Sequence, residues 1–159
     1  FLRGIEASLT LHPVSFIHLE NGFSFTRATN RTTKESLPFI PAATLRNELR
    51  FEPKINGTEH SYLSVGIDNF FKQSKIDSFE QPSSGYTLLN AAIGTTVKLS
   101  KTQDITVYIA GKNLLDKAYY DHLSRFKPGR LSDEDPTLGI YNQGRNVTFG
   151  VNIPFTLKK

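Results

Sequence analysis

The sequence lacks cysteine and methionine, and it has no long apolar run. Without cysteine there is no disulfide framework and no thiolate metal site. No segment approaches the roughly 18 to 20 consecutive apolar residues that a membrane-spanning helix needs, and the mean hydropathy is −0.33. A transmembrane β-barrel is compatible with this low hydropathy, because its lipid-facing residues alternate with polar residues that face the lumen.

Features typical of two other protein classes are also missing. The net charge is +4 and the isoelectric point is about 9.3, but the lysines and arginines are scattered and fall mostly near expected turns. A nucleic-acid binder would gather them on one patch or arm, so we expect no nucleic-acid partner. The sequence contains no G-x-S-x-G elbow, H-E-x-x-H motif, P-loop or dinucleotide fingerprint, and we therefore expect no enzyme.

Apolar residues at every second position dominate the chain, which is typical of strands with one apolar and one polar face. No segment shows the periodicity of an amphipathic helix. The apolar members of the seven sets are Ile5, Ala7, Leu9 and Leu11; Ile17, Leu19, Phe23 and Phe25; Leu45, Leu49 and Phe51; Leu63, Val65, Ile67 and Phe71; Leu89, Ala91, Ile93, Val97 and Leu99; Ile105, Val107 and Ile109; and Val147, Phe149, Val151, Ile153 and Phe155. The predicted fold class is all-β and antiparallel.

The segments between these strands alternate strictly in length. Short junctions are expected around 12–15, at 54–57, where Asn-Gly favours a turn, and at 100–104; long ones are expected at 28–41, 73–85 and 114–140. Transmembrane up-and-down barrels show this alternation because their periplasmic turns are short and their extracellular loops long. Bacterial barrels have an even number of strands. An odd count, a start at Phe1 rather than methionine and the lack of a signal-peptide pattern favour a fragment of a longer protein.

The last third of the chain carries two motifs, N-L-x-D-x-x-Y and Gly-Arg-Asn before a final alternating run. Together they resemble the penultimate strand, the following loop and the terminal strand of TonB-dependent outer-membrane receptors. Weaker similarities occur at 3–6, 38–41 and 85–90. Members of the family usually end on an aromatic residue, whereas in this chain four further residues follow Phe155. The motif residues, to which the resemblance assigns a structural role, are Asn113, Leu114, Asp116, Tyr119, Gly144, Arg145, Asn146 and Phe155.

The resemblance implies that residues 1–159 are the C-terminal portion of a barrel domain with about 22 strands, whose plug domain and earlier strands are absent from this sequence. Such receptors lie in the outer membrane of Gram-negative bacteria and contact its lipid. They import a scarce nutrient with energy from the TonB complex, which acts through the N-terminal part. We expect the cargo to be a ferric siderophore or another small-molecule iron complex, and we expect no cofactor.

Candidate ligand-binding residues lie in the longest loop, where Arg125, Lys127 and Arg130 could attract an anionic metal chelate. The acidic run 133–135 follows them, so the loop can also be a solvated, self-neutralising surface. His122 lies in the same loop, and a hydrogen-bonded structural role is favoured over metal binding because no second ligand stands at a suitable spacing. None of the four histidines forms a recognisable metal site with another.

Two alternatives to the receptor remain open. A soluble β-barrel or sandwich acting as a binding module would show the same alternation of residues, and it would fold in water without an exposed apolar belt. A passive porin or a barrel enzyme would also span the outer membrane, but without a plug.

Overall fold

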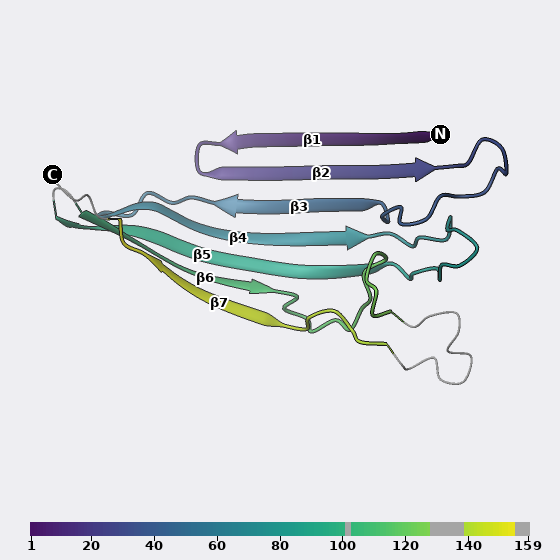
Figure 1. Ribbon diagram of the computed structural model, residues 1–159. Helices are drawn as coiled ribbons and strands as arrows, with labels where there is room; N and C mark the ends of the chain where they lie inside the picture. Colours follow the sequence, from purple (N-terminus) through teal and green to yellow (C-terminus); the bar gives the residue numbers. More distant parts are fainter. Residues whose placement is uncertain (101–102, 128–138, 155–159) are drawn as a thin grey trace, which may run out of the picture.

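Seven strands form one antiparallel sheet in which each strand pairs with the next in sequence. The computed structural model describes residues 1–100, 103–127 and 139–154 (Figure 1). Within these ranges no helix is long and apolar enough to cross a membrane. The strands are β1 (Leu2–Val14), β2 (Ile17–Ala28), β3 (Thr44–Phe51), β4 (Thr58–Phe70), β5 (Tyr86–Ser100), β6 (Gln103–Lys112) and β7 (Asn146–Asn152). The predicted all-β, up-and-down antiparallel architecture is confirmed.

Short and long connections lie at opposite ends of the sheet. The long ones, 29–43, 71–85 and the described parts of 113–145, gather at the end where the N-terminus lies, and the short ones, 15–16 and 52–57, lie at the opposite end (Figure 1). In the 55–58 turn the Thr58 amide donates to the Ile55 carbonyl at 3.1 Å. Only Gly57 has a positive φ there, at 83°, which is typical of a type II turn rather than type I′.

The observed strand ends differ from the sequence pattern in three places. β1 continues through Pro13 to Val14, because a register shift between Leu11 and Val14 accommodates a residue that has no amide hydrogen. β4 ends one residue before Phe71. β7 ends at Asn152 rather than continuing through Ile153, and Phe155 lies outside the described residues.

Two rows of apolar residues cross the whole sheet on one face, which we call the outer face. Directly opposite partners in antiparallel strands lie on the same face, so each row follows from the pairing register. The first row is Val14, Ile17, Phe51, Leu63, Ile93, Ile109 and Phe149; the second is Leu11, Leu19, Leu49, Val65, Ala91, Gly111 and Val147. The outer face therefore carries an unbroken apolar band.

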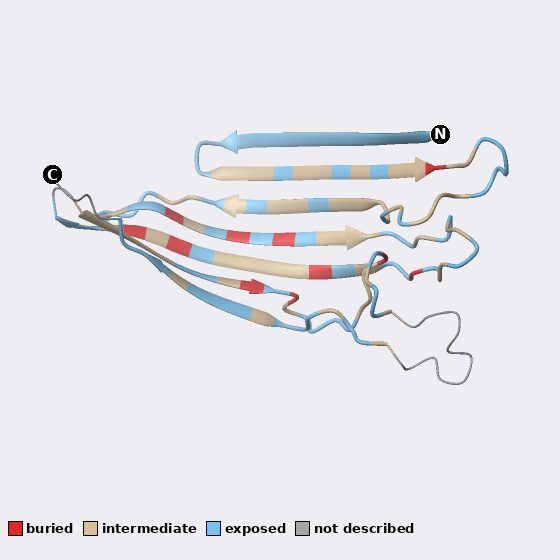
Figure 2. Ribbon diagram, viewed as in Figure 1, coloured by how far each residue is buried: buried red, intermediate tan, exposed pale blue. Residues whose placement is uncertain are grey.

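The opposite, inner face is polar and less exposed than the outer one. In β4 the inner-face residue Ser64 is 5% exposed, whereas its neighbours Leu63 and Val65 are 47% and 42% exposed. Among the described residues only two hydrophobic side chains, Ala28 and Leu88, are buried. Figure 2 places most buried positions on β4 to β6 and shows β1 exposed along its length. This is the reverse of a water-soluble sheet, in which the apolar face is covered.

Tyrosine and glycine alternate across four strands of the inner face, in the order Tyr62, Gly94, Tyr108, Gly150. A Cβ atom on Gly94 would lie 2.6 Å from Cε1 of Tyr62, and one on Gly150 would overlap the Tyr108 ring. The Arg50 guanidinium lies 4.0 Å from the Tyr62 ring centroid and holds that ring in place. Each tyrosine thus covers the glycine of the next strand, an arrangement that fixes register.

We expect Gly94→Ala to lower the free energy of unfolding of the complete protein by about 1–3 kcal/mol, because the added methyl group would force the Tyr62 ring to move. Chemical denaturation in detergent or lipid measures this. Gly22→Ala is the matched control, since a Cβ there meets nothing within 4 Å. Equal effects of the two substitutions would contradict the packing role of the tyrosines.

Candidate functional site

The three long connections are joined to one another by hydrogen bonds. The Gln73 side-chain amide donates to the carbonyls of Ile40 and Pro41 at 3.2 and 3.1 Å, which links the first connection to the second. The second and third connections meet where the Lys127 ammonium donates to the Gln81 carbonyl at 3.1 Å. Residues 29–43, 71–85, 113–127 and 139–145 therefore form one hydrogen-bonded layer, which we call the loop layer.

Asn113 joins the end of β6 to the loop layer. Its side chain is 3% exposed; its oxygen accepts the Lys117 amide at 2.8 Å, and its nitrogen donates to the Lys117 carbonyl at 2.9 Å. Its φ of 49° lies in the left-handed region, which asparagine tolerates better than most residues. The neighbouring Leu114 amide donates to the Leu89 carbonyl of β5 at 2.8 Å. The N-L pair of the motif thus closes a turn against the sheet.

Asp116 connects this turn to the start of β7. Its carboxylate accepts the Arg145 amide at 2.8 Å, and a Cβ on Gly144 would lie 2.7 Å from the same oxygen. Asn146 then opens β7 opposite Lys112 of β6. The two sequence motifs are therefore adjacent in space, and glycine is required at 144 because the carboxylate approaches the backbone.

Tyr119 belongs to a stack of three aromatic rings at the base of the loop layer. The rings of Phe70 and Tyr86 are 4.5 Å apart, and those of Tyr86 and Tyr119 are 4.3 Å apart. The Tyr86 hydroxyl donates to the Asp121 carboxylate at 3.1 Å. Burial raises the pKa of Tyr119, and the Asp121 charge acts in the same direction. The stack fixes the third connection over the ends of β4 and β5.

A buried polar cluster lies between the second and third connections. His122 is 4% exposed, and its Nδ1 lies 3.0 Å from the Ser83 hydroxyl. Its Nε2 faces the Glu80 carboxylate at 3.8 Å. The Glu80 carboxylate also accepts the amides of Phe39 and Asp77, each at 3.0 Å. Glu80 therefore ties the first two connections together and His122 adds the third.

Lys127 completes this cluster from one side. Its ammonium donates to the carbonyls of Gln81 and His122, at 3.1 and 2.7 Å. Burial lowers the pKa of Lys127. Burial also lowers the pKa of His122, with a smaller contribution from the Lys127 charge. The neutral imidazole is thus favoured, and the direction of its hydrogen bond with the Ser83 hydroxyl depends on which ring nitrogen carries the hydrogen.

Two of the three sequence-predicted ligand residues, Arg125 and Lys127, lie in the part of the chain that the structure describes. Arg125 is exposed, whereas Lys127 is partly buried and bound to backbone carbonyls. Arg130 and the acidic run 133–135 lie outside the described residues. The roles of Glu80 and Ser83 were not predicted, since nothing in a polar connection distinguishes them from its other charged and hydroxyl residues.

The inner face is hollowed from β1 to β6, and the hollow holds about 510 Å³. Its charged lining includes Glu20, Arg46, Glu48, Asp68 and Lys112. Asp68 lies 3.9 Å from Arg46 and accepts the Asn90 side-chain amide at 3.0 Å. Asn90 in turn accepts the Asn113 backbone amide at 3.1 Å. Polar contacts thus connect the inner face to the loop layer.

The described residues hold no group of three or more His, Asp or Glu side chains suited to a metal ion. Two histidines nevertheless meet across the first short turn, where His12 Nδ1 lies 2.6 Å from His18 Nδ1. The sequence spacing did not predict this contact, because it depends on the pairing register that sets Leu11 opposite Leu19. A single pair supplies fewer ligands than a typical zinc site needs.

Comparisons with known proteins support the fold. No protein-family model matches the chain, and no curated protein matches it. Among solved structures, a chain described as the copper transporter OprC is similar over 96% of this chain, with a TM-score of 0.70 and 16% sequence identity. The match spans 22% of that neighbour's length. At this identity the likeness concerns the fold.

Replacing Asn113 by alanine should loosen the third connection by about 1–3 kcal/mol, because two hydrogen bonds, to the Lys117 amide and to its carbonyl, are lost. Hydrogen exchange of residues 113–127 in the complete protein measures this opening. Leu115→Ala, at a side chain that is 69% exposed, is the control. Unchanged exchange in the Asn113 variant would show that the side chain does not hold the turn.

Acidification should open the contact between the second and third connections. Because the folded-state pKa of His122 is lowered, His122 takes up a proton more readily when the loops are open than when they are closed. The stabilisation is present above the ordinary histidine pKa of about 6.5 and is lost as pH falls below it. We expect amide protection factors around Ser83 and His122 to fall several-fold between about pH 7.5 and 5. His122→Gln should flatten this dependence, and an identical fall in that variant would contradict the assignment.

Proposed function

We propose that this chain is part of the barrel of a TonB-dependent transporter in the outer membrane of a Gram-negative bacterium. The single observation that carries the proposal is the pair of apolar rows that cross all seven strands on the exposed outer face. Lipid is the solvent that such a face requires, because water would leave the whole band hydrated. The polar, hollowed inner face is then the lumen.

The arrangement of the connections supports the same proposal. The three long connections gather at one end of the sheet and the short ones at the other, as extracellular loops and periplasmic turns do in outer-membrane barrels. A soluble binding module explains neither this segregation nor the exposure of Leu49, Ile93 and Phe149, which are 52%, 54% and 68% exposed. The loop layer is accordingly extracellular, and Arg125 lies on it.

Residues outside this sequence would supply the rest of the transporter. Within the described residues, both edge strands, β1 and β7, have one unpaired side. Unpaired backbone groups are costly in a bilayer, so we expect further strands to close the barrel. The matched neighbour is several times longer than this chain. A plug domain would contact inner-face charges such as Arg46, Glu48 and Arg50, and the TonB complex would act through an N-terminal segment. The barrel segment itself needs no cofactor and acts as no enzyme.

For the cargo we propose a ferric siderophore or another iron complex, with copper as the second candidate. The resemblance of the Asn113–Tyr119 and Gly144–Asn146 motifs to the receptor family favours the iron complex. The structural neighbour described as a copper transporter favours copper. This chain has neither cysteine nor methionine, the soft ligands that Cu(I) prefers, so any copper ligand in it would be histidine or an oxygen donor.

Uptake by cells that carry or lack the complete protein tests the proposal. We expect deletion to lower accumulation of an iron-55 siderophore complex at least several-fold under iron limitation, and re-expression to restore it only when TonB is present. Copper accumulation, measured in the same strains, is the matched comparison. Loss of copper uptake alone would replace the iron complex by copper. Uptake that persists without TonB would contradict an energised transporter and favour a passive porin.

A further inference from the structure

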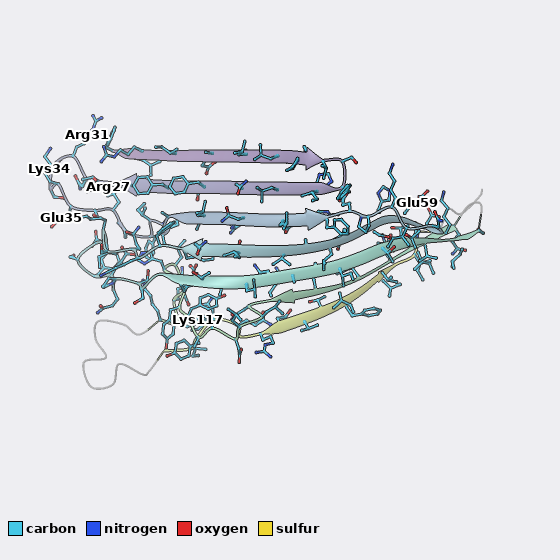
Figure 3. The ribbon with its side chains drawn as sticks, turned by 180° about the vertical axis from the view of Figure 1, so that it is seen from behind. Arg27, Arg31, Lys34, Glu35, Glu59 and Lys117 are labelled. Carbon is cyan, nitrogen blue, oxygen red and sulfur yellow. The ribbon has the colours of Figure 1, made fainter. Side chains whose placement is uncertain are left out.

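Four cationic residues line a hollow of about 360 Å³ at the long-connection end of β1 and β2. Arg3 and Arg27 come from the two strands, and Arg31 and Lys34 come from the connection that follows β2. Figure 3 labels Arg27, Arg31 and Lys34 at this end of the sheet. The lining includes no carboxylate. We call this group the basic cluster.

The basic cluster lies on the outer face, not in the lumen. Arg3 pairs directly with Arg27, and the next pair on the same face is Ile5 with Phe25. Side chains two residues apart in a strand share a face. The two arginines therefore extend the apolar band by one step toward the loop layer. In a membrane barrel this is the level at which acyl chains give way to headgroups.

The positive charge of the cluster is not neutralised by the protein around it. Like charges directly opposite in a ladder are destabilising, and Arg3 and Arg27 are such a pair. Among the described ion pairs, none includes Arg3, Arg27, Arg31 or Lys34. Arg31 instead lies over the Phe1 ring, 5.2 Å from its centroid. Four cations held together in this way attract an external anion.

We propose that the basic cluster binds the phosphate of a membrane-lipid headgroup in the leaflet on the long-connection side, a proposal that rests on the membrane location proposed above. Guanidinium groups bind phosphate through paired hydrogen bonds. Ile5, Phe23 and Phe25, which are 62%, 36% and 38% exposed, continue from the cluster along the outer face and suit the acyl chains of the same lipid. One lipid molecule therefore meets complementary groups along its length.

Cargo and free phosphate fit this surface less well than a lipid. Cargo moving through the barrel meets the inner face, which is on the other side of the sheet. A free anion would gain the charge interaction but leave the adjoining phenylalanines uncovered. The headgroup phosphate of a lipid is also held at the bilayer surface, so its local concentration beside the cluster is high.

Lipid binding to the complete protein in detergent micelles tests the proposal. The probes are dioleoylphosphatidic acid, dioleoylglycerol, which has the same acyl chains without phosphate, and inorganic phosphate. Native mass spectrometry counts the bound molecules at each lipid concentration. We expect phosphatidic acid to bind at least tenfold more tightly than dioleoylglycerol, and millimolar inorganic phosphate not to displace it. Equal binding of the two lipids, or full displacement by inorganic phosphate, would overturn the proposal.

Substitutions locate the effect. Arg3→Gln with Arg27→Gln should lower the affinity for phosphatidic acid about tenfold or more, and Arg31→Gln with Lys34→Gln should lower it without altering the strands. Lys54→Gln with Lys98→Gln removes the same charge from the opposite end and should have no effect. Loss of affinity in this control equal to that in the cluster variants would reduce the effect to net charge and overturn the site.

The outcomes also separate this proposal from the one on which it rests. If the complete protein imports its cargo when it is embedded in lipid but shows no preference for phosphatidic acid, the lipid site alone is overturned. A protein that does not enter detergent micelles or membranes as a folded barrel contradicts the membrane location, and the lipid site fails with it.

Discussion

The structure depends on a register of strand pairing that places the apolar residues of all seven strands on the same face of the sheet. Side chains alternate between the two faces, so a slip of one residue would send a whole strand's apolar set to the polar side. Six successive pairings place Phe51, Leu63 and Ile93 in one row with four other apolar residues. The tyrosines that lie over Gly94 and Gly150 favour the same register from the inner face. The apolar outer face and the polar inner face both follow from this register.

Because the apolar residues face outward, polar residues hold the rest of the chain together. Ser64, Thr96, Asn113 and His122 are among the few buried side chains. The loop layer is stabilised by side-chain bonds to backbone groups, from Asn113 to Lys117 and from Glu80 to Phe39, rather than by a hydrophobic core. Such bonds are individually modest. Their geometry nevertheless fixes how the described parts of the three long connections lie against one another.

Sequence alone predicted the strands and the alternation of their connections, because both depend on a period of two that neighbouring residues reveal. It placed Asn113, Asp116 and Arg145 in two motifs but gave no sign that Asp116 accepts the Arg145 amide across 29 residues. The contact between Ser83 and His122 and the pairing of Arg3 with Arg27 were likewise not predictable. Each depends on register or on how connections fold over one another, which local patterns do not encode. The end of β7 at Asn152 also differs from the sequence pattern, because the alternation of apolar and polar residues continues beyond the last residue that pairs with β6.

The direct test of the central claim is the accessibility of consecutive positions along β4 in the complete protein within a lipid bilayer. Spin labels placed singly at Leu63, Ser64, Val65, Gly66 and Ile67 report collisions with oxygen, which concentrates in lipid, and with a water-soluble nickel chelate. A lipid-facing outer surface predicts a period of two, with oxygen favoured at Leu63, Val65 and Ile67 and the chelate relatively favoured at Ser64 and Gly66. Comparable exposure of all five positions to the chelate, with no alternation in oxygen, would contradict a lipid-facing outer surface.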